Sequence, residues 1–188
     1  MKVSRAQAAL SRERILETAA KLFREHGFDG IGIADLMKEA GLTHGGFYGH
    51  FSSKEELIAD ASTRALKDTF ALMSKQAERA QGDPLAAVAS RYLSSKHRND
   101  PGTGCPLAAL GPEVARQGQA VREIVTDYVR SAVNLLMTLV AGKTRAARRQ
   151  KAISTYAVLL GALVTARAVD DRELSREILE AGLATVKG

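Results

Sequence analysis

Apolar residues recur at every third or fourth position along almost the whole chain, which is the spacing of one face of an α-helix. Near the N-terminus, one such stripe consists of Ile15, Ala19, Leu22 and Phe23. Alternating runs of β-branched residues, which are typical of strands, do not occur, and the chain has only four prolines. The pattern predicts an all-α protein.

Glycine, proline and capping residues divide this pattern into nine predicted helices. They cover residues 11–26, 33–40, 43–50, 53–81, 84–97, 105–115, 120–140, 144–169 and 173–186. Ser11 is predicted to be the N-cap of the first helix, and Gly27 and Gly41 are predicted to end the first two. Ser53 and Glu56 have the spacing of a capping box at the start of the fourth helix.

The segment LMKEAGLTHGGFYGHFSSKEEL, residues 36–57, carries the most specific signal in the chain. A short helix ends at Gly41, which can adopt the positive φ of a sharp turn. Thr43 can cap the next helix through its hydroxyl, and that helix is short and rich in glycine and aromatic residues. This arrangement predicts a helix-turn-helix unit whose second helix enters the major groove of double-stranded DNA.

The N-terminal end of that second helix combines polar side chains with a lack of bulk. Thr43 and His44 have the reach and the hydrogen-bonding groups to contact base edges or phosphates. Gly45 and Gly46 each cost roughly 1 kcal/mol inside a helix, so we interpret them as positions where the backbone approaches the duplex closely. The plainer alternative is that the two glycines mark a loop.

Three further residues flank this end. Phe47 and Phe51, four positions apart, are expected to face the core. Tyr48 and His50 fall outside that stripe, and a phenol or an imidazole can donate a hydrogen bond to a phosphate. Lys54 opens the fourth helix, where free amides and the helix dipole already favour an anion. The alternatives are packing of the tyrosine, a surface imidazole and a solvated lysine.

The motif AGLTHGGFYGHFSSKEEL, preceded by SRERILETAAKLFREHGFDG, resembles the TetR family of bacterial transcriptional regulators over residues 11–57. The resemblance implies a homodimer with an N-terminal DNA-binding head and a C-terminal domain that binds a small-molecule inducer. It also implies that DNA is contacted by Thr43, His44, Gly45, Tyr48, His50 and Lys54. The chain departs from the family at Ile31 and Gly32, where a hydroxyl residue usually opens the second helix; this weakens the cap.

On this basis we expect residues 1–52 to form a helix-turn-helix DNA-binding domain and residues 53–188 a helical ligand-binding and dimerisation domain. The stretch 153–169 is apolar almost all round, and the last helix carries a matching stripe. These last two long helices are the expected homodimer surface, where two copies would form a four-helix bundle. The alternative is that both stripes belong to the core of the monomer.

Cys105, the single cysteine, follows the loop at 99–104 and precedes Pro106. A thiol at a helix N-terminus can be reactive, so Cys105 is a candidate sensor of oxidants or electrophiles. The alternative is a small, inert, partly buried cysteine. A ligand cavity is expected among the fifth to eighth helices, where Tyr92 and Tyr128 would offer polar anchors.

Composition limits the remaining function classes. The chain has 188 residues and a net charge of +6, which is compatible with a polyanionic partner. The four histidines lack the paired spacing of metal ligands, and no phosphate-binding loop or nucleophile motif occurs. We therefore expect no enzyme, no metal and no cofactor. Neither a signal sequence nor an apolar run of about 18 residues is present, which predicts a cytoplasmic protein that does not enter a membrane.

The sequence thus predicts a one-component transcriptional repressor of the TetR type, released from a palindromic operator by a small-molecule inducer, with electrophiles among the candidates. The alternative is a constitutive architectural protein that binds DNA without a ligand. The moderate net charge argues against that alternative, because sequence-independent binding depends more heavily on neutralising phosphates. Activation instead of repression stays open, as do the operator sequence and the identity of the inducer.

Overall fold

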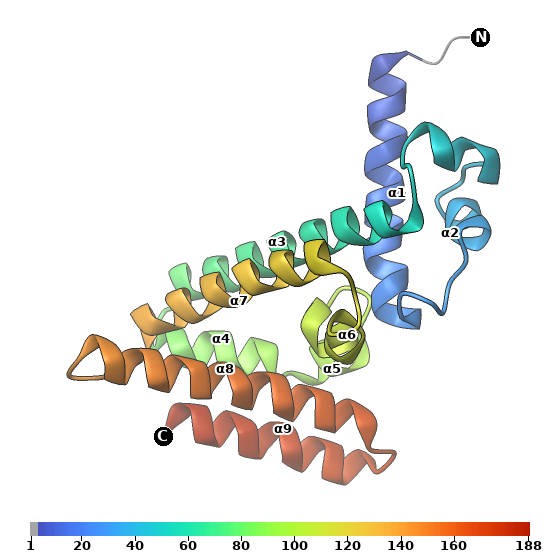
Figure 1. The fold of residues 1–188 in the computed structure, drawn as a ribbon. Coiled ribbons are helices and arrows are strands. Elements are labelled where there is room, and N and C mark those ends of the chain that lie inside the picture. Colours follow the sequence, from blue (N-terminus) through green and yellow to red (C-terminus); the bar gives the residue numbers. More distant parts are fainter. Residues whose placement is uncertain (1–3) are drawn as a thin grey trace.

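The computed structural model describes residues 4–188, and every regular element in that range is helical (Figure 1). The elements are α1 (Arg5–His26), α2 (Ile33–Glu39), the 3-10 helix η1 (His44–Gly49), α3 (Lys54–Glu78), α4 (Pro84–Tyr92), α5 (Ser95–Asn99), α6 (Pro106–Val114), α7 (Gln119–Leu139), α8 (Arg145–Ala168) and α9 (Arg172–Lys187). The all-α prediction is confirmed. No helix among the described residues is both long enough and apolar enough to cross a bilayer.

Glycine and capping residues fix most helix ends. Gly27 and Gly41 have positive φ values of 83° and 69° at the ends of the first two helices, as expected of glycine; Gly27, with ψ 167°, is not in the left-handed helical conformation that was predicted for it. The prediction of Ser11 as the first N-cap was wrong, because α1 begins upstream, where the hydroxyl of Ser4 accepts a hydrogen bond from the N–H of Gln7 (3.1 Å). The alanine-rich segment before Ser11 favours a helix and continues it in that direction.

The predicted fifth helix is two helices in the structure. α4 ends at Tyr92, and α5 follows directly because the side chain of Ser94 accepts a hydrogen bond from the N–H of His97 (3.2 Å) and caps a new helix. The break turns the chain and brings the His97 ring onto the ring of Tyr92, with centroids 4.8 Å apart. This turn forms one wall of the pocket described below.

The buried side chains form two hydrophobic clusters. The head cluster joins α1, α2, η1 and the first half of α3, and the body cluster joins α4, α7, α8, α9 and the second half of α3. In Figure 1 the head stands at one end of the paired helices α3 and α7, while α8 and α9 pack together on the far side of the body. α3 is therefore common to both clusters.

The short helix α6 also belongs to both clusters. Cys105 and Ala108, at its N-terminal end, pack in the body cluster, whereas Leu110 and Val114, at its C-terminal end, pack in the head cluster. A displacement of α6 in the body therefore moves side chains that pack in the head. The domain boundary after residue 52 remains a prediction, since the head cluster extends beyond it along α3.

Candidate functional site

The turn between α2 and η1 has the geometry that the sequence predicts for a helix-turn-helix unit. The N–H of Gly41 donates to the carbonyl of Lys38 (2.9 Å), and the N–H of Leu42 donates to the carbonyl of Met37 (2.8 Å). These bonds satisfy carbonyls that the end of α2 would otherwise leave free. At the other end of α2, Gly32 provides no side-chain cap, as its lack of a hydroxyl implies.

The second helix of the unit is a 3-10 helix, not the α-helix that the sequence predicts. Gly45 and Gly46 lower the helix propensity, and 3-10 winding is common in short segments. Thr43 holds the N-cap position, but its hydroxyl makes no capping hydrogen bond, so that predicted cap is wrong. Phe47 and Phe51 do face the core as predicted, because both are buried and their rings stack with centroids 5.7 Å apart.

The predicted DNA-contacting residues of this unit lie on its outer surface. Thr43, His44 and Gly45 are exposed, and Gly46 and His50 are partly exposed. Tyr48 is 66% exposed, although the edge of its ring rests against Phe47 with centroids 5.2 Å apart. A large ring held in this way on a buried neighbour is oriented before any partner arrives. We call residues 43–50 the reading segment.

Packing within the chain does not account for the two glycines of the reading segment. Neither has a positive φ. A Cβ added at Gly45 would lie in open space, and one added at Gly46 would make only ordinary contacts, 3.6 Å from Oγ1 of Thr43 and 3.8 Å from Cε of Met37. The fold would tolerate a Cβ at both positions, and at Gly45 the missing side chain leaves open space on the outer surface.

Lys54 opens α3 as predicted, but its ammonium group already has a partner. Nζ donates to the carbonyl of Ile31, in the loop before α2 (3.0 Å). Ser53 caps α3 by accepting from the N–H of Glu56 (3.2 Å), which confirms the predicted capping spacing. The hydroxyl and the N–H of Ser52 donate to the Glu56 carboxylate (2.6 and 2.7 Å) and lower the pKa of Glu56. A phosphate contact of Lys54 stays a prediction.

Arg12 is a residue of the head that sequence reasoning missed. Its guanidinium group pairs with Asp60 of α3 and lies over the ring of Phe51, 4.7 Å from the centroid. The contact joins α1 to α3 directly behind the reading segment. Arg12 and Asp60 are 48 positions apart, so no local pattern could have announced the pair.

A pocket opens in the body between α3, α4 and the loop before α6. It encloses about 110 Å³, and its wall includes Leu72, Met73, Val88, Arg91, Tyr92, His97 and Cys105. Mostly apolar walls with a few polar groups are typical of pockets for small molecules. Of the three predicted ligand residues, Tyr92 and Cys105 line this pocket, whereas Tyr128 lies in the body cluster and not in the pocket wall.

Cys105 is shielded from solvent, with 1% of its surface exposed. Its N–H donates to Nε2 of His97 (2.9 Å), while Nδ1 of His97 donates to the carbonyl of Tyr92 (2.7 Å). One ring nitrogen accepts and the other donates, so His97 is neutral here, and burial lowers its pKa. Cys105 and His97 both line the pocket, which is therefore the opening through which a reagent would approach the thiol.

Tyr156 completes a polar group that sequence reasoning missed, because its apolar neighbours along the chain marked it only as core. Tyr92, Tyr128 and Tyr156 are buried, and their hydroxyl oxygens make no hydrogen bond of ordinary geometry with any residue that the structure describes. Tyr92 and Tyr128 nevertheless lie close enough to the Cys105 thiol, and Tyr128 to Tyr156, to act on one another's pKa. Burial is the largest cause that raises the pKa of each tyrosine, and the Cys105 thiol raises it further. We call these three hydroxyls and the thiol the tyrosine cluster.

Comparison with known proteins places these features in a family. Residues 15–61 match the model of the tetR family of bacterial regulatory proteins. The transcriptional repressor NemR of Escherichia coli K12 is 27% identical over 187 residues, which cover 94% of this chain and 92% of NemR. The Bacillus subtilis regulators YxaF and LmrA are 29% and 28% identical over 64% and 60% of this chain; the matches span 65% and 62% of their own lengths.

Comparison with solved structures also finds regulators with a similar fold. The crystal structure of the reduced form of E. coli NemR has a TM-score of 0.78 and 26% identity, and the match covers 94% of this chain and 95% of that one. A TetR-family regulator from Cytophaga hutchinsonii shares the fold, with a TM-score of 0.82 at 23% identity over 100% of this chain and 98% of that one.

The helix-turn-helix unit on an all-helical body defines the class of the protein as a DNA-binding transcriptional regulator. Within that class, the family model and the relatives compared above support a regulator of the TetR family. The relatives compared above are named as regulators and repressors, and such proteins are not enzymes. Among residues 4–188, no group of three or more His, Cys, Asp or Glu side chains could hold a metal ion.

Proposed function

We propose that the protein is a homodimeric repressor that binds a palindromic operator and is released from it by a small molecule bound in the body. One observation carries the DNA-binding part: the reading segment presents polar groups and unfilled space on a base of buried aromatic rings. NemR, similar over most of its length, is named a transcriptional repressor. We assign DNA binding to residues 1–52, ligand binding and dimerisation to residues 53–188, and a cytoplasmic location.

In this proposal, the N-terminal end of η1 enters the major groove. Thr43 and His44, both exposed, meet base edges, which carry a distinct pattern of donors and acceptors for each base pair. Gly45 and Gly46 allow the backbone to lie against the duplex, because no side chain holds it away.

The flanks of the reading segment bind phosphates and set the register of the head on the duplex. Tyr48 supplies an exposed hydroxyl on one side, and His50 a partly exposed imidazole. Lys54 lies at the first position of α3, beside free amide groups. Its ammonium group has three donors, so one can hold the carbonyl of Ile31 while another binds a phosphate.

A second copy of the chain is proposed to cover the outer face of α8 and α9. Ile153, Val164 and Leu174 are 47%, 40% and 43% exposed on that face, and the small residues Ala157 and Gly161 lie exposed between them along α8. Large apolar side chains beside small ones allow close packing of helices. Four helices from two protomers would form a bundle and hold two heads about 34–36 Å apart, one turn of DNA.

Release is proposed to pass through α6. At its N-terminal end, the guanidinium group of Arg24 on α1 donates to the carbonyl of Gly104, next to Cys105 (3.0 Å). At its C-terminal end, the N–H of Phe28 donates to the carboxylate of Glu113 (2.7 Å). A ligand that displaces α6 would therefore move the head. It releases DNA only if it binds the displaced state more tightly.

Cys105 offers a chemical route to the same displacement. An electrophile small enough to enter the pocket would alkylate the thiol and enlarge a side chain that is now fully packed. Alkylation kinetics test this route, with an accessible model thiol as the reference. A thiol that reacts only when the protein is unfolded would exclude it and leave reversible binding as the inducing event.

Selection of bound DNA from a random pool tests the proposed function. A palindrome with half-sites about one helical turn apart is the expected product, and compounds that enter the pocket should then release it. Even recovery of unrelated sequences would instead support the architectural protein that needs no ligand. A compound that binds the body without weakening the complex would contradict ligand-controlled release by that compound.

A further inference from the structure

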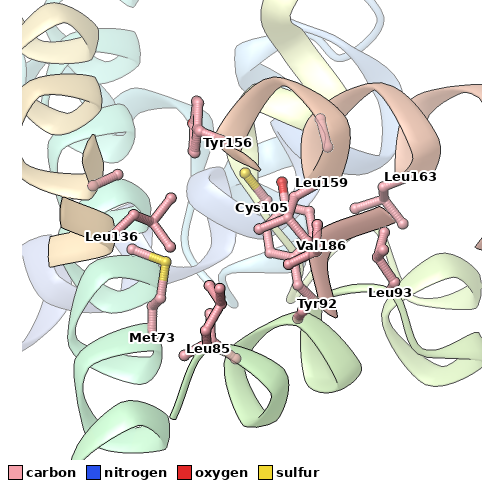
Figure 2. Packing of buried hydrophobic residues seen from close by; sticks show 14 of the residues in the cluster. Met73, Leu85, Tyr92, Leu93, Cys105, Leu136, Tyr156, Leu159, Leu163 and Val186 are labelled. Carbon is pink, nitrogen blue, oxygen red and sulfur yellow. The ribbon is translucent and has the colours of Figure 1, made fainter. Parts of the chain in front are cut away.

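Three tyrosine hydroxyls converge on the N-terminal end of α6 from three different helices. Tyr92 is on α4, Tyr128 on α7 and Tyr156 on α8, and Figure 2 shows Cys105 lying between Tyr156 and Tyr92. Each hydroxyl oxygen is shielded from solvent and has no hydrogen-bond partner among residues 4–188. Tyrosines up to 64 residues apart in the sequence thus place their polar ends near Cys105, whose thiol acts on the pKa of all three.

This arrangement is unfavourable for the folded chain by itself. A buried hydroxyl without a partner destabilises the folded state, and a buried tyrosine hydroxyl usually finds a partner. Phenylalanine would fill the same space in each case without that cost. A cluster of three such groups therefore indicates a partner that the described chain does not supply.

The cluster is within reach of a molecule in the pocket. Tyr92 and Cys105 belong both to the tyrosine cluster and to the pocket wall, and Leu72, Met73 and Val88 supply apolar surface around them. A ligand that buried an apolar part between these side chains would bring its leading end to the hydroxyls. Tyr128 and Tyr156 belong to the same buried cluster but not to the pocket wall, so a ligand would reach them only if Cys105 and Tyr92 moved apart.

Building on the proposed ligand-controlled release, we propose that the tyrosine cluster binds the carbonyl oxygen of an uncharged, largely apolar molecule. The three phenols are donors that need an acceptor, and burial raises the pKa of Tyr92, Tyr128 and Tyr156, which keeps them protonated. A carbonyl oxygen on an apolar frame has two lone pairs, so it accepts from two of the phenols without bringing a charge into the body cluster.

A carboxylate is the competing ligand. Two guanidinium groups lie beside Cys105, and both bind backbone carbonyls: Arg24 that of Gly104 (3.0 Å), and Arg167 those of His97 and Arg98 (2.6 and 3.1 Å). Each retains one buried N–H group without a partner among the described residues. We assign them to holding the loop before α6, so the experiment must separate a neutral acceptor from an anion.

Calorimetric titration distinguishes a neutral acceptor from an anion. The full chain is titrated without DNA, and the probes are acetophenone, ethylbenzene and benzoate. Acetophenone should bind about tenfold or more tightly than ethylbenzene, which has the same frame but no acceptor. Tyr128→Phe and Tyr156→Phe should each weaken acetophenone binding about 3- to 10-fold and leave ethylbenzene binding unchanged. Without ligand, both variants should melt at the wild-type temperature or above it, because each loses an unpaired hydroxyl.

Thr138→Val is the matched control, since it removes a hydroxyl from the exposed side of α7. The proposal is overturned if acetophenone does not bind, if it binds no better than ethylbenzene, if the two phenylalanine variants bind it like the wild type, or if benzoate binds more tightly. These titrations contain no DNA, so their outcome does not depend on whether the chain is a repressor. Acetophenone that binds as expected but does not release DNA would count against the proposed function alone.

Discussion

The head and the body place their polar residues in opposite environments. In the head, the polar groups of the reading segment are exposed, and two glycines leave space that the fold does not need. In the body, the polar groups of the tyrosine cluster are buried and lack partners. The head thus presents a finished surface to a large partner, whereas the body holds unsatisfied groups for a small one.

The two sites also differ in how the chain builds them. The reading segment and its phenylalanine base fall within nine consecutive residues, 43–51, so local sequence fixes their relation. The tyrosine cluster is assembled from α4, α6, α7 and α8, and its geometry depends on how these helices pack. A change in helix packing would therefore alter the body site first, and would reach the head through α3, α6 and the start of α7, which contribute to both clusters.

The largest expected effect comes from removing Phe47, one of the two buried rings that support the reading segment. Phe47→Ala should lower the free energy of unfolding by about 3–5 kcal/mol, because the ring is fully buried in the head cluster. Urea denaturation measures it. The neighbouring Tyr48→Ala is the control and should change stability by about 0.5 kcal/mol at most, since that ring is largely exposed. Equal losses of unfolding free energy in the two variants would show that Phe47 supports the head no more than the exposed Tyr48 does.

Filling the space at Gly45 should affect DNA binding and not folding. Gly45→Val is expected to weaken operator binding about 100-fold, because base contacts worth about 1–3 kcal/mol each would be held apart, while the melting temperature stays close to that of the wild type. Gly82→Val, in the loop after α3, also adds a side chain in open space and serves as the control. An unchanged operator affinity in Gly45→Val would show that the backbone does not approach DNA there.

The link between body and head can be cut at Arg24. Arg24→Gln should keep operator affinity and ligand affinity near wild type but weaken the effect of one on the other by up to about tenfold, since coupling free energies are typically 1–3 kcal/mol. Operator titrations with and without ligand measure that coupling. Lys21→Gln, on the exposed side of α1, is the control. Full coupling in Arg24→Gln would place the route elsewhere.

At the edge of the head, Lys54→Ala tests a single phosphate contact. It should weaken DNA binding on all sequences and reduce the slope of log affinity against log salt by about 1. Lys67→Ala, farther along α3, should leave that slope unchanged, because its side chain is not expected to meet DNA. If Lys67→Ala reduced the slope and Lys54→Ala did not, the phosphate contact would lie near Lys67 instead of near Lys54.

The smallest expected effect concerns pH and the body. His97 is neutral in the fold with a lowered pKa, whereas in the unfolded chain it takes up a proton near its ordinary pKa of about 6.5. The unfolded state then binds more protons, so the free energy of unfolding should fall as the pH drops below about 6.5. His97→Asn should flatten this dependence in denaturation curves from pH 7.5 to 5.5. The same slope in both proteins would assign the effect to other groups.

Features that depend on residues close together in the sequence, such as helix ends, were predicted correctly in most cases. Gly27, Gly41 and Pro84 mark real helix boundaries, and the DNA-contact candidates between residues 43 and 54 are exposed or partly exposed. Ser11 failed as a cap because alanines upstream favour the same helix, and the break at Ser94 was missed because one side-chain hydrogen bond decides it.

Residues brought together by distant segments escaped prediction for a physical reason. Tyr156 lies at an ordinary core spacing in its own helix, and only packing against α4 and α7 gives its hydroxyl polar neighbours. Arg24 meets Gly104 across 80 positions, a contact that no periodic pattern encodes. The same holds for the pocket, whose wall joins α3, α4 and the loop before α6.

Methylation protection on a selected operator tests the placement of the reading segment most directly. If residues 43–50 lie in the major groove, guanine N7 atoms should be protected in two patches whose centres are about one helical turn apart, and Gly45→Val should lose both patches. Protection confined to adenine N3 atoms, which face the minor groove, would contradict that placement.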